Sequence, residues 1–76
     1  MSSCSEWAVL RLAAEYARLQ ESCAAQFRAY ARTARDAGAS DLERTYLTEA
    51  VWCDGAAAGA RGAAHDILTK LRRSGL

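Results

Sequence analysis

Apolar residues recur every three or four positions along two long stretches of the chain, and a polar turn around Gly38 separates the two stretches. This spacing is typical of amphipathic helices, so it predicts one helix over about 5–37 and another over about 41–73. The turn at 38–40 is short, and helices joined by so short a connection lie side by side and antiparallel. We therefore expect an all-α, coiled-coil-like, alanine-rich helical hairpin that forms a single domain over residues 1–76.

Two apolar seams with a spacing of 3.5 residues fit one antiparallel register. The seam of the first helix contains Val9, Leu12, Tyr16, Leu19, Cys23, Gln26 and Tyr30, and the seam of the second, read backwards, contains Ile67, Ala64, Ala60, Ala57, Cys53, Ala50 and Tyr46. The residue numbers of each pair of counterparts add up to 76, so a single fold-back brings all the pairs together. Bulky residues then meet small ones, as Leu19 meets Ala57, and these pairs are expected to form the hairpin core.

The helix ends carry recognisable signals. Gly38 follows the first helix and supplies the left-handed conformation in which many helices end. Ser3 with Glu6, and Ser40 with Glu43, have the spacing of a capping box, in which a serine hydroxyl and a carboxylate satisfy free N–H groups of the first turn. The sequence therefore predicts that each helix begins with a side-chain cap.

Three glycines, Gly55, Gly59 and Gly62, interrupt the second helix. Each costs about 1 kcal/mol relative to alanine inside a helix. We expect the cost to be offset by a close approach of the two helices, for which small residues leave room. The alternative is a break at Asp54–Gly55, with Asp54 as the N-cap of a third helix.

A second apolar seam flanks the first one. A lone hairpin would leave this seam in water, which is unusual for a soluble monomer, whereas two hairpins stacked face to face would bury it. We therefore predict a homodimeric four-helix bundle with a two-fold axis. Its expected interface contains Leu10, Ala13, Ala17, Ala24, Phe27, Ala31, Leu47, Val51, Ala58 and Leu68.

Charge and composition argue against a typical nucleic-acid binder and against a membrane-spanning or exported protein. Ten Lys and Arg against nine Asp and Glu give a net charge of +1, which is not the strong positive field of a typical nucleic-acid binder. The N-terminus has no basic leader followed by an apolar run, and no stretch approaches the apolar length of a membrane span. These features favour a cytoplasmic protein.

The residues that carry most enzyme and metal chemistry are sparse and poorly spaced. His65 is the only histidine and is not part of a Glu-x-x-His motif, so we expect no metal site, no cofactor and no enzymatic activity. Cys23 and Cys53 share a predicted layer, where packing as free thiols is the main expectation and a reversible disulfide is the alternative. Cys4, close to the N-terminus, is the thiol expected to be most open to oxidation.

Two tryptophans lie away from the predicted core seam. Tryptophan and arginine are enriched among the residues that anchor protein interfaces, so we expect one partner-binding patch at Trp52 with Glu49 and Arg44, and another at Trp7 with Arg11. In the alternative interpretation each tryptophan covers the edge of the bundle. The resulting hypothesis is a small non-enzymatic regulator that binds a larger protein, as an inhibitor, antiactivator or adaptor of the kind carried by phages or mobile elements, and this last step is an analogy at the level of fold.

Two other functions stay open. Arg28, Arg32 and Arg35 form a basic stripe near the end of the first helix. The expected hairpin dimer is similar in size and architecture, though not in sequence motif, to Rop-like helical dimers, which bind RNA through one helical face. The stripe therefore offers nucleic-acid binding as an alternative, and the chain could also be a structural subunit of a larger assembly.

Overall fold

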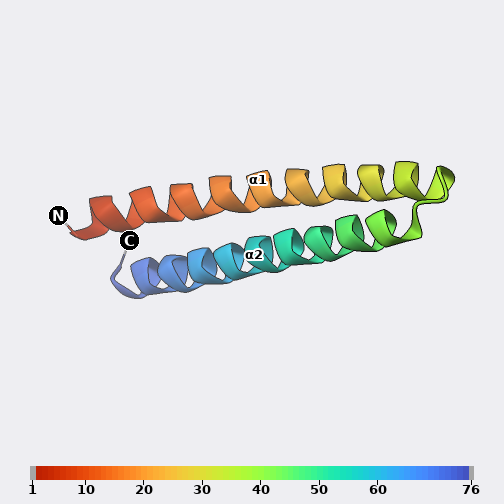
Figure 1. The fold of residues 1–76 in the computed structure, drawn as a ribbon. Coiled ribbons are helices and arrows are strands. Elements are labelled where there is room, and N and C mark those ends of the chain that lie inside the picture. Colours follow the sequence, from red (N-terminus) through yellow and green to blue (C-terminus); the bar gives the residue numbers. More distant parts are fainter. Residues whose placement is uncertain (1, 76) are drawn as a thin grey trace.

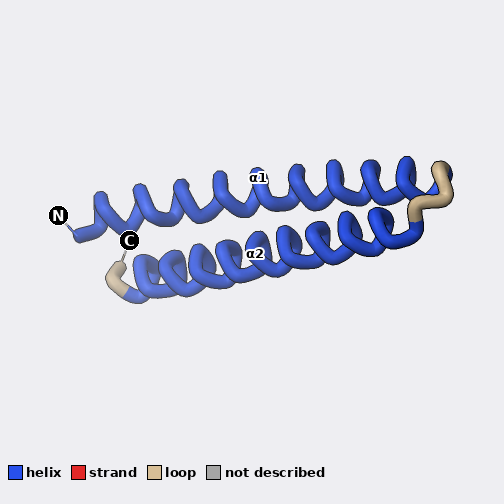
Figure 2. The backbone as a smooth tube through the Cα atoms, in the orientation of Figure 1, coloured by secondary structure: helices blue, strands red, loops and turns tan. Residues whose placement is uncertain are grey.

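The computed structural model describes residues 2–75, and the side chains from Ser5 onward. Two long helices, α1 (Ser2–Asp36) and α2 (Ser40–Arg73), lie antiparallel and pack along their whole length (Figure 1). They form a thin rod with extents of 57 × 14 × 12 Å. Figure 2 shows that only the connection between the helices and the end of α2 are non-helical in the described part of the chain. The all-α hairpin predicted from the sequence is therefore confirmed, with α1 starting three residues and α2 one residue earlier than expected.

The turn ends α1 in the predicted way. Gly38 adopts a φ of 76°, in the left-handed region. The Gly38 N–H donates to the carbonyl of Arg35 at 3.0 Å, and the Ala39 N–H donates to the carbonyl of Ala34 at 2.8 Å. This pair of hydrogen bonds is the Schellman motif, which satisfies carbonyls at the helix end. The prediction for Gly38 is confirmed.

The capping box predicted at Ser40 is not formed. Ser40 is the first residue of α2 rather than its N-cap, and the N-cap, Ala39, makes no side-chain capping hydrogen bond. The Schellman turn ends at Ala39, which takes the N-cap position of α2. The Ser40 hydroxyl is therefore one residue too far along the helix to cap it. Asp41 and Glu43 still place negative charge in the first turn, where the helix dipole favours it. The other predicted box begins at Ser3, which lies inside α1 and whose side chain is outside the described ones.

Helix α2 runs without a break through its glycine-rich segment, so the alternative of a third helix starting at Asp54 is wrong. The explanation expected for the glycines is also wrong. A Cβ atom built on Gly55, Gly59 or Gly62 would meet nothing within 4 Å. These glycines therefore face outward from α2, and their cost in helix stability is not offset inside the hairpin.

The core of the hairpin is built almost entirely from alanine. Leu71 is the single large residue in it, and no large side chain is completely buried among the described residues. The remaining core residues are Ala17, Ala24, Ala31, Ala34, Ala50 and Ala57. Small residues on both sides allow two backbones to approach closely, but they bury little apolar surface.

The structure corrects which face of α1 packs against α2. On α2 the predicted seam is used, since Ala50 and Ala57 are buried. On α1 the bulky seam is left outside, with Leu12 63% and Leu19 65% exposed, so the predicted contact of Leu19 with Ala57 is wrong. The α1 residues expected at a dimer interface fill the hairpin core instead: Ala17, Ala24 and Ala31 are buried, and Leu10, Ala13 and Phe27 are half-buried. Of the α2 residues expected there, Leu47, Val51 and Ala58 are exposed and Leu68 is half-buried.

One pair of the predicted register does lie close together across the helices. The rings of Tyr30 and Tyr46, a predicted pair, have centroids 5.5 Å apart. Relative to the expectation, α1 is therefore rotated about its own axis so that its small-residue face, rather than its bulky face, meets α2.

Candidate functional site

Two ion pairs bridge the helices on one broad side of the hairpin, which we call the ion-pair face. Arg61 of α2 donates from Nε and Nη2 to the two carboxylate oxygens of Glu21 on α1, at 3.0 and 2.6 Å. Arg28 of α1 pairs with Asp54 of α2. All four side chains are about half exposed. The pairs fix the level of one helix against the other, which an alanine core specifies only weakly.

Charge pairing shifts the protonation of these groups. The hydrogen bonds from Arg61, together with its positive charge, hold the pKa of Glu21 below its ordinary value, although partial desolvation works in the opposite direction. The hydrogen bond to Glu21 and its charge raise the pKa of Arg61 in turn. Sequence reasoning missed these pairs. The signal was available, because Glu21 and Arg28 are one heptad apart on α1 and opposite charges, Asp54 and Arg61, are one heptad apart on α2.

The other broad side of the hairpin is apolar along α1. A step of two residues along a helix turns the side chain by about 200°, so residues two positions from Glu21 and Arg28 point away from the ion-pair face. The bulky seam occupies these positions, and we call it the α1 apolar face. It contains Val9, Leu12, Tyr16, Leu19, Cys23 and Tyr30, all of which are exposed.

Three aromatic rings close the end of this face nearest the turn. The Phe27 ring stacks on the Tyr46 ring at a centroid distance of 6.1 Å and meets the Tyr30 ring edge-on at 6.4 Å. The Gln26 amide donates to the Tyr30 hydroxyl at 2.8 Å. This cluster joins α1 to α2 and continues the α1 apolar face across both helices.

The outer side of α2 carries the most exposed large hydrophobic side chain in the described part of the chain. Trp52 is 73% exposed and Val51 is 68% exposed. These two residues line a shallow hollow together with Gly55 and Ala56. We call these four residues the α2 outer patch. Trp52 does not cover the bundle edge, which was the alternative interpretation.

The other residues predicted to bind a partner do not join this patch into one site. Glu49 and Arg44, on the same helix as Trp52, are exposed. Trp7 is exposed with Arg11 near the start of α1, at the end of the rod that is remote from the turn (Figure 1). The two tryptophans therefore belong to separate surfaces.

The basic stripe considered for nucleic-acid binding is partly neutralised. Arg28 is engaged with Asp54, and the Arg35 Nε lies 4.0 Å from the Asp36 carboxylate. Arg32 is exposed beside them. Neutralised arginines lose part of the phosphate attraction on which such binding depends.

The thiols and the histidine form no evident reactive site in the described residues. Cys23 and Cys53 are free thiols. Desolvation, followed by the nearby charges of Cys23, Glu49 and Asp54, raises the pKa of the Cys53 thiol, which lowers its reactivity. The His65 Nδ1 lies 3.9 Å from the Asp66 carboxylate on an exposed surface. Cys4 lies outside the described side chains.

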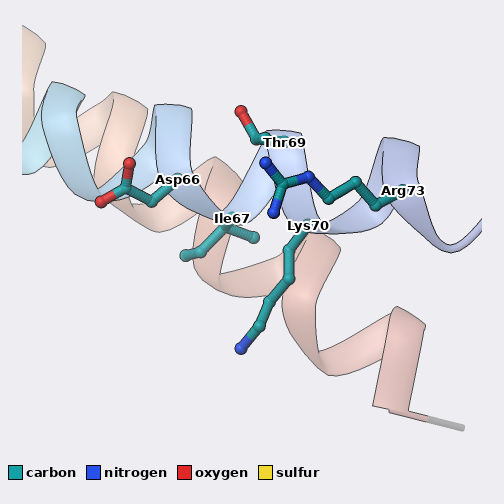
Figure 3. Close-up of a pocket in the computed structure, with 5 residues that line it drawn as sticks. All are labelled: Asp66, Ile67, Thr69, Lys70 and Arg73. Atoms are coloured by element: carbon teal, nitrogen blue, oxygen red, sulfur yellow. The ribbon is translucent and has the colours of Figure 1, made fainter.

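A second hollow lies near the C-terminal end of α2 and is lined by Asp66, Ile67, Thr69, Lys70 and Arg73. Figure 3 shows the Arg73 guanidinium lying back along the helix beside Thr69, whereas the Lys70 side chain extends away from it. The polar groups do not converge on a common point. Within residues 2–75 no group of three or more His, Cys, Asp and Glu could hold a metal ion, and no helix is long and apolar enough to cross a membrane.

The α1 apolar face and the α2 outer patch thus expose large apolar side chains that the fold of a single hairpin does not require. The chain matches no protein-family model, no curated protein and no solved structure. Its candidate functional residues are therefore identified from its own surfaces and contacts.

Proposed function

We propose that the protein is a small non-enzymatic regulator that binds another protein through the α2 outer patch. The observation that carries this proposal is the exposure of Trp52, which is 73% accessible on a rigid helix next to exposed Val51. Tryptophan is the residue type most enriched among those that dominate binding energy at protein interfaces. An exposed tryptophan contributes nothing to the hairpin core, so we propose that it contributes to binding a partner.

The outward glycines support the same surface. Gly55 lies in the patch, and Gly59 follows one turn later, with open space where a Cβ atom would be. Alanine at either position would make the free helix more stable. A partner whose backbone packs closely against α2 beside Trp52 would account for these glycines, because a Cβ atom at either position would keep the two backbones further apart.

Nucleic-acid binding is the weaker candidate. The chain has a net charge of only +1, and Arg28 is engaged in an ion pair. Docking through a tryptophan also differs in its response to salt. Binding to phosphates weakens steeply as salt rises, whereas apolar docking does not.

Site-specific photo-crosslinking tests the proposal. A benzophenone amino acid replaces Trp52 in the full chain produced in its native host, and a matched control carries the same group at Asp66, which lies about four turns further along the same side of α2. We expect a protein adduct from position 52 and none from position 66. Excess wild-type protein should suppress the adduct, while excess Trp52→Ala protein should not. A nucleic-acid adduct, an adduct only with the chain itself, or no adduct would contradict the proposal.

A further inference from the structure

The α1 apolar face leaves a row of large apolar side chains unpartnered in the single hairpin. We infer that this face is a self-association surface, on which a second copy of the chain packs to complete an antiparallel four-helix bundle. This interface differs from the one predicted from the sequence, because the α1 half of that predicted interface is already buried within the hairpin. The inference does not depend on docking at the α2 outer patch.

The accessible surface of the hairpin is larger than that of a compact monomer of the same mass. The chain exposes 5547 Å². A compact folded monomer of 8.2 kDa exposes about 4,500 Å², so the excess is about 1,000 Å². Each partner in a stable protein interface buries about 800 Å². The excess therefore matches what one copy would contribute to a dimer, and packing two thin rods side by side is the direct way to remove it.

The chemistry of the face suits permanent burial. Its six positions hold no charged side chain. Arg28 pairs with Asp54 on the other broad side, whereas Glu15 and Arg18 share a hollow with Leu19 and so border the face without belonging to it. At its end, the polar Tyr30 hydroxyl already accepts a hydrogen bond from Gln26. Burial would consequently require little desolvation of charge, which is the main cost of covering a polar surface.

The same broad side of the hairpin offers a complementary surface on α2. Ala63 lies two residues beyond Arg61, so it points away from the ion-pair face and toward the side of the α1 apolar face, and Ala60 lies three residues before it on that side. They are small, whereas Leu12, Tyr16 and Leu19 are bulky. A two-fold axis parallel to the rod sets α1 of one copy against α2 of the other, and the bulky ridge then fills the small-residue groove in both directions.

Stability also favours a second copy over an unlike partner. The core contains six alanines and one leucine, which supply little hydrophobic stabilisation for 76 residues. A partner needed to stabilise every copy must be present in at least equal amount. Another copy of the same chain always meets that condition.

Sedimentation equilibrium of the full, reduced chain tests the inference. The wild type should have a mass of twice 8.2 kDa at micromolar concentration. Leu19→Glu places a charge in the proposed interface and should halve this mass. Leu47→Glu is the matched control, because Leu47 is also exposed but lies one heptad from Asp54 on the ion-pair face, and it should remain dimeric. A monomeric wild type, a dimeric Leu19→Glu variant, or loss of the dimer only in Leu47→Glu would overturn the inference.

A measurement on the wild type covers the case in which Leu19→Glu fails to fold. The reaction of Cys23 with a maleimide, located by mass spectrometry, should slow several-fold as protein concentration rises through the dimer dissociation constant. A rate that does not change with concentration would overturn the inference even if sedimentation showed a dimer, since the dimer would then use another face. Trp52→Ala should leave both readouts unchanged, so failure of the docking proposal and failure of the dimer inference can be told apart.

Discussion

Arg61 on α2 donates two hydrogen bonds to Glu21 on α1, with Nη2 2.6 Å and Nε 3.0 Å from the two carboxylate oxygens. Two parallel hydrogen bonds fix both the distance and the orientation of the helices, which a single point charge cannot do. The pair is half exposed, so its contribution to stability is modest, but its contribution to register is specific.

Acid should weaken the hairpin through this pair. Because Arg61 lowers the pKa of Glu21 in the folded state, the pair stabilises the fold fully above the unfolded pKa of glutamate, about 4.3, and the stabilisation is lost as pH falls through the lower folded pKa. Thermal unfolding followed by circular dichroism from pH 7 to pH 2 should show that Glu21→Gln is less stable than the wild type at pH 7. The difference should disappear at the acidic end. A constant difference over the whole range would show that the substitution acts through packing.

Exchanging the charges of the second bridge should test the register. Arg28→Asp and Asp54→Arg each place like charges opposite one another and should lower the unfolding midpoint. The double variant restores an opposite-charge pair in reversed order and should recover most of the loss, as a double-mutant cycle in urea would measure. Additive losses in the double variant would mean that these residues do not meet in solution.

Periodicity and turn chemistry were enough to predict the hairpin. The 3.5-residue spacing predicted two helices, Gly38 predicted the turn, and the short connection predicted that the helices are antiparallel. The contact of Tyr30 with Tyr46 was also predicted, but the ion pairs Glu21–Arg61 and Arg28–Asp54, whose residue numbers add up to 82 rather than 76, do not follow the predicted register. The features that were predicted depend on neighbours in sequence or on the length of the loop.

The rotation of α1 could not be predicted in the same way. Helix α1 has two adjacent apolar stripes, a bulky one through Leu12 and Leu19 and a small one through Ala17 and Ala24. Pattern analysis places the bulkier stripe in the core because it buries more surface. The structure uses the small stripe, which allows close backbone approach and brings Glu21 level with Arg61. The choice depends on distances between helices, which sequence spacing does not contain. If the bulky stripe were buried between two copies of the chain, both apolar stripes of α1 would be buried, and the exposure of the bulkier one would be explained.

Enlarging the alanine core should destabilise the hairpin. Ala24 is completely buried, so Ala24→Leu should overpack the contact between the helices and cost about 1–3 kcal/mol in the free energy of unfolding. Ala25→Leu is the matched control, since Ala25 is the exposed neighbour, and it should be close to neutral. Urea denaturation measures both. Equal stability of the two variants would indicate that α1 turns its other face to α2.

Replacing outward glycines should stabilise the free protein. Gly55 and Gly59 lie inside α2 with open space at the Cβ position, so Gly55→Ala and Gly59→Ala should each raise the free energy of unfolding by about 1 kcal/mol in urea denaturation. Gly38→Ala is the control with the opposite sign, because the φ of 76° at that turn is unfavourable for alanine.

If the bare backbone beside Trp52 serves a partner, the same stabilising alanines should reduce crosslinking from position 52 even though the free hairpin folds better. Stability and binding would then move in opposite directions, which a purely structural role for the glycines does not produce. Unchanged crosslinking in the stabilised Gly55→Ala and Gly59→Ala variants would show that the partner does not approach the glycines.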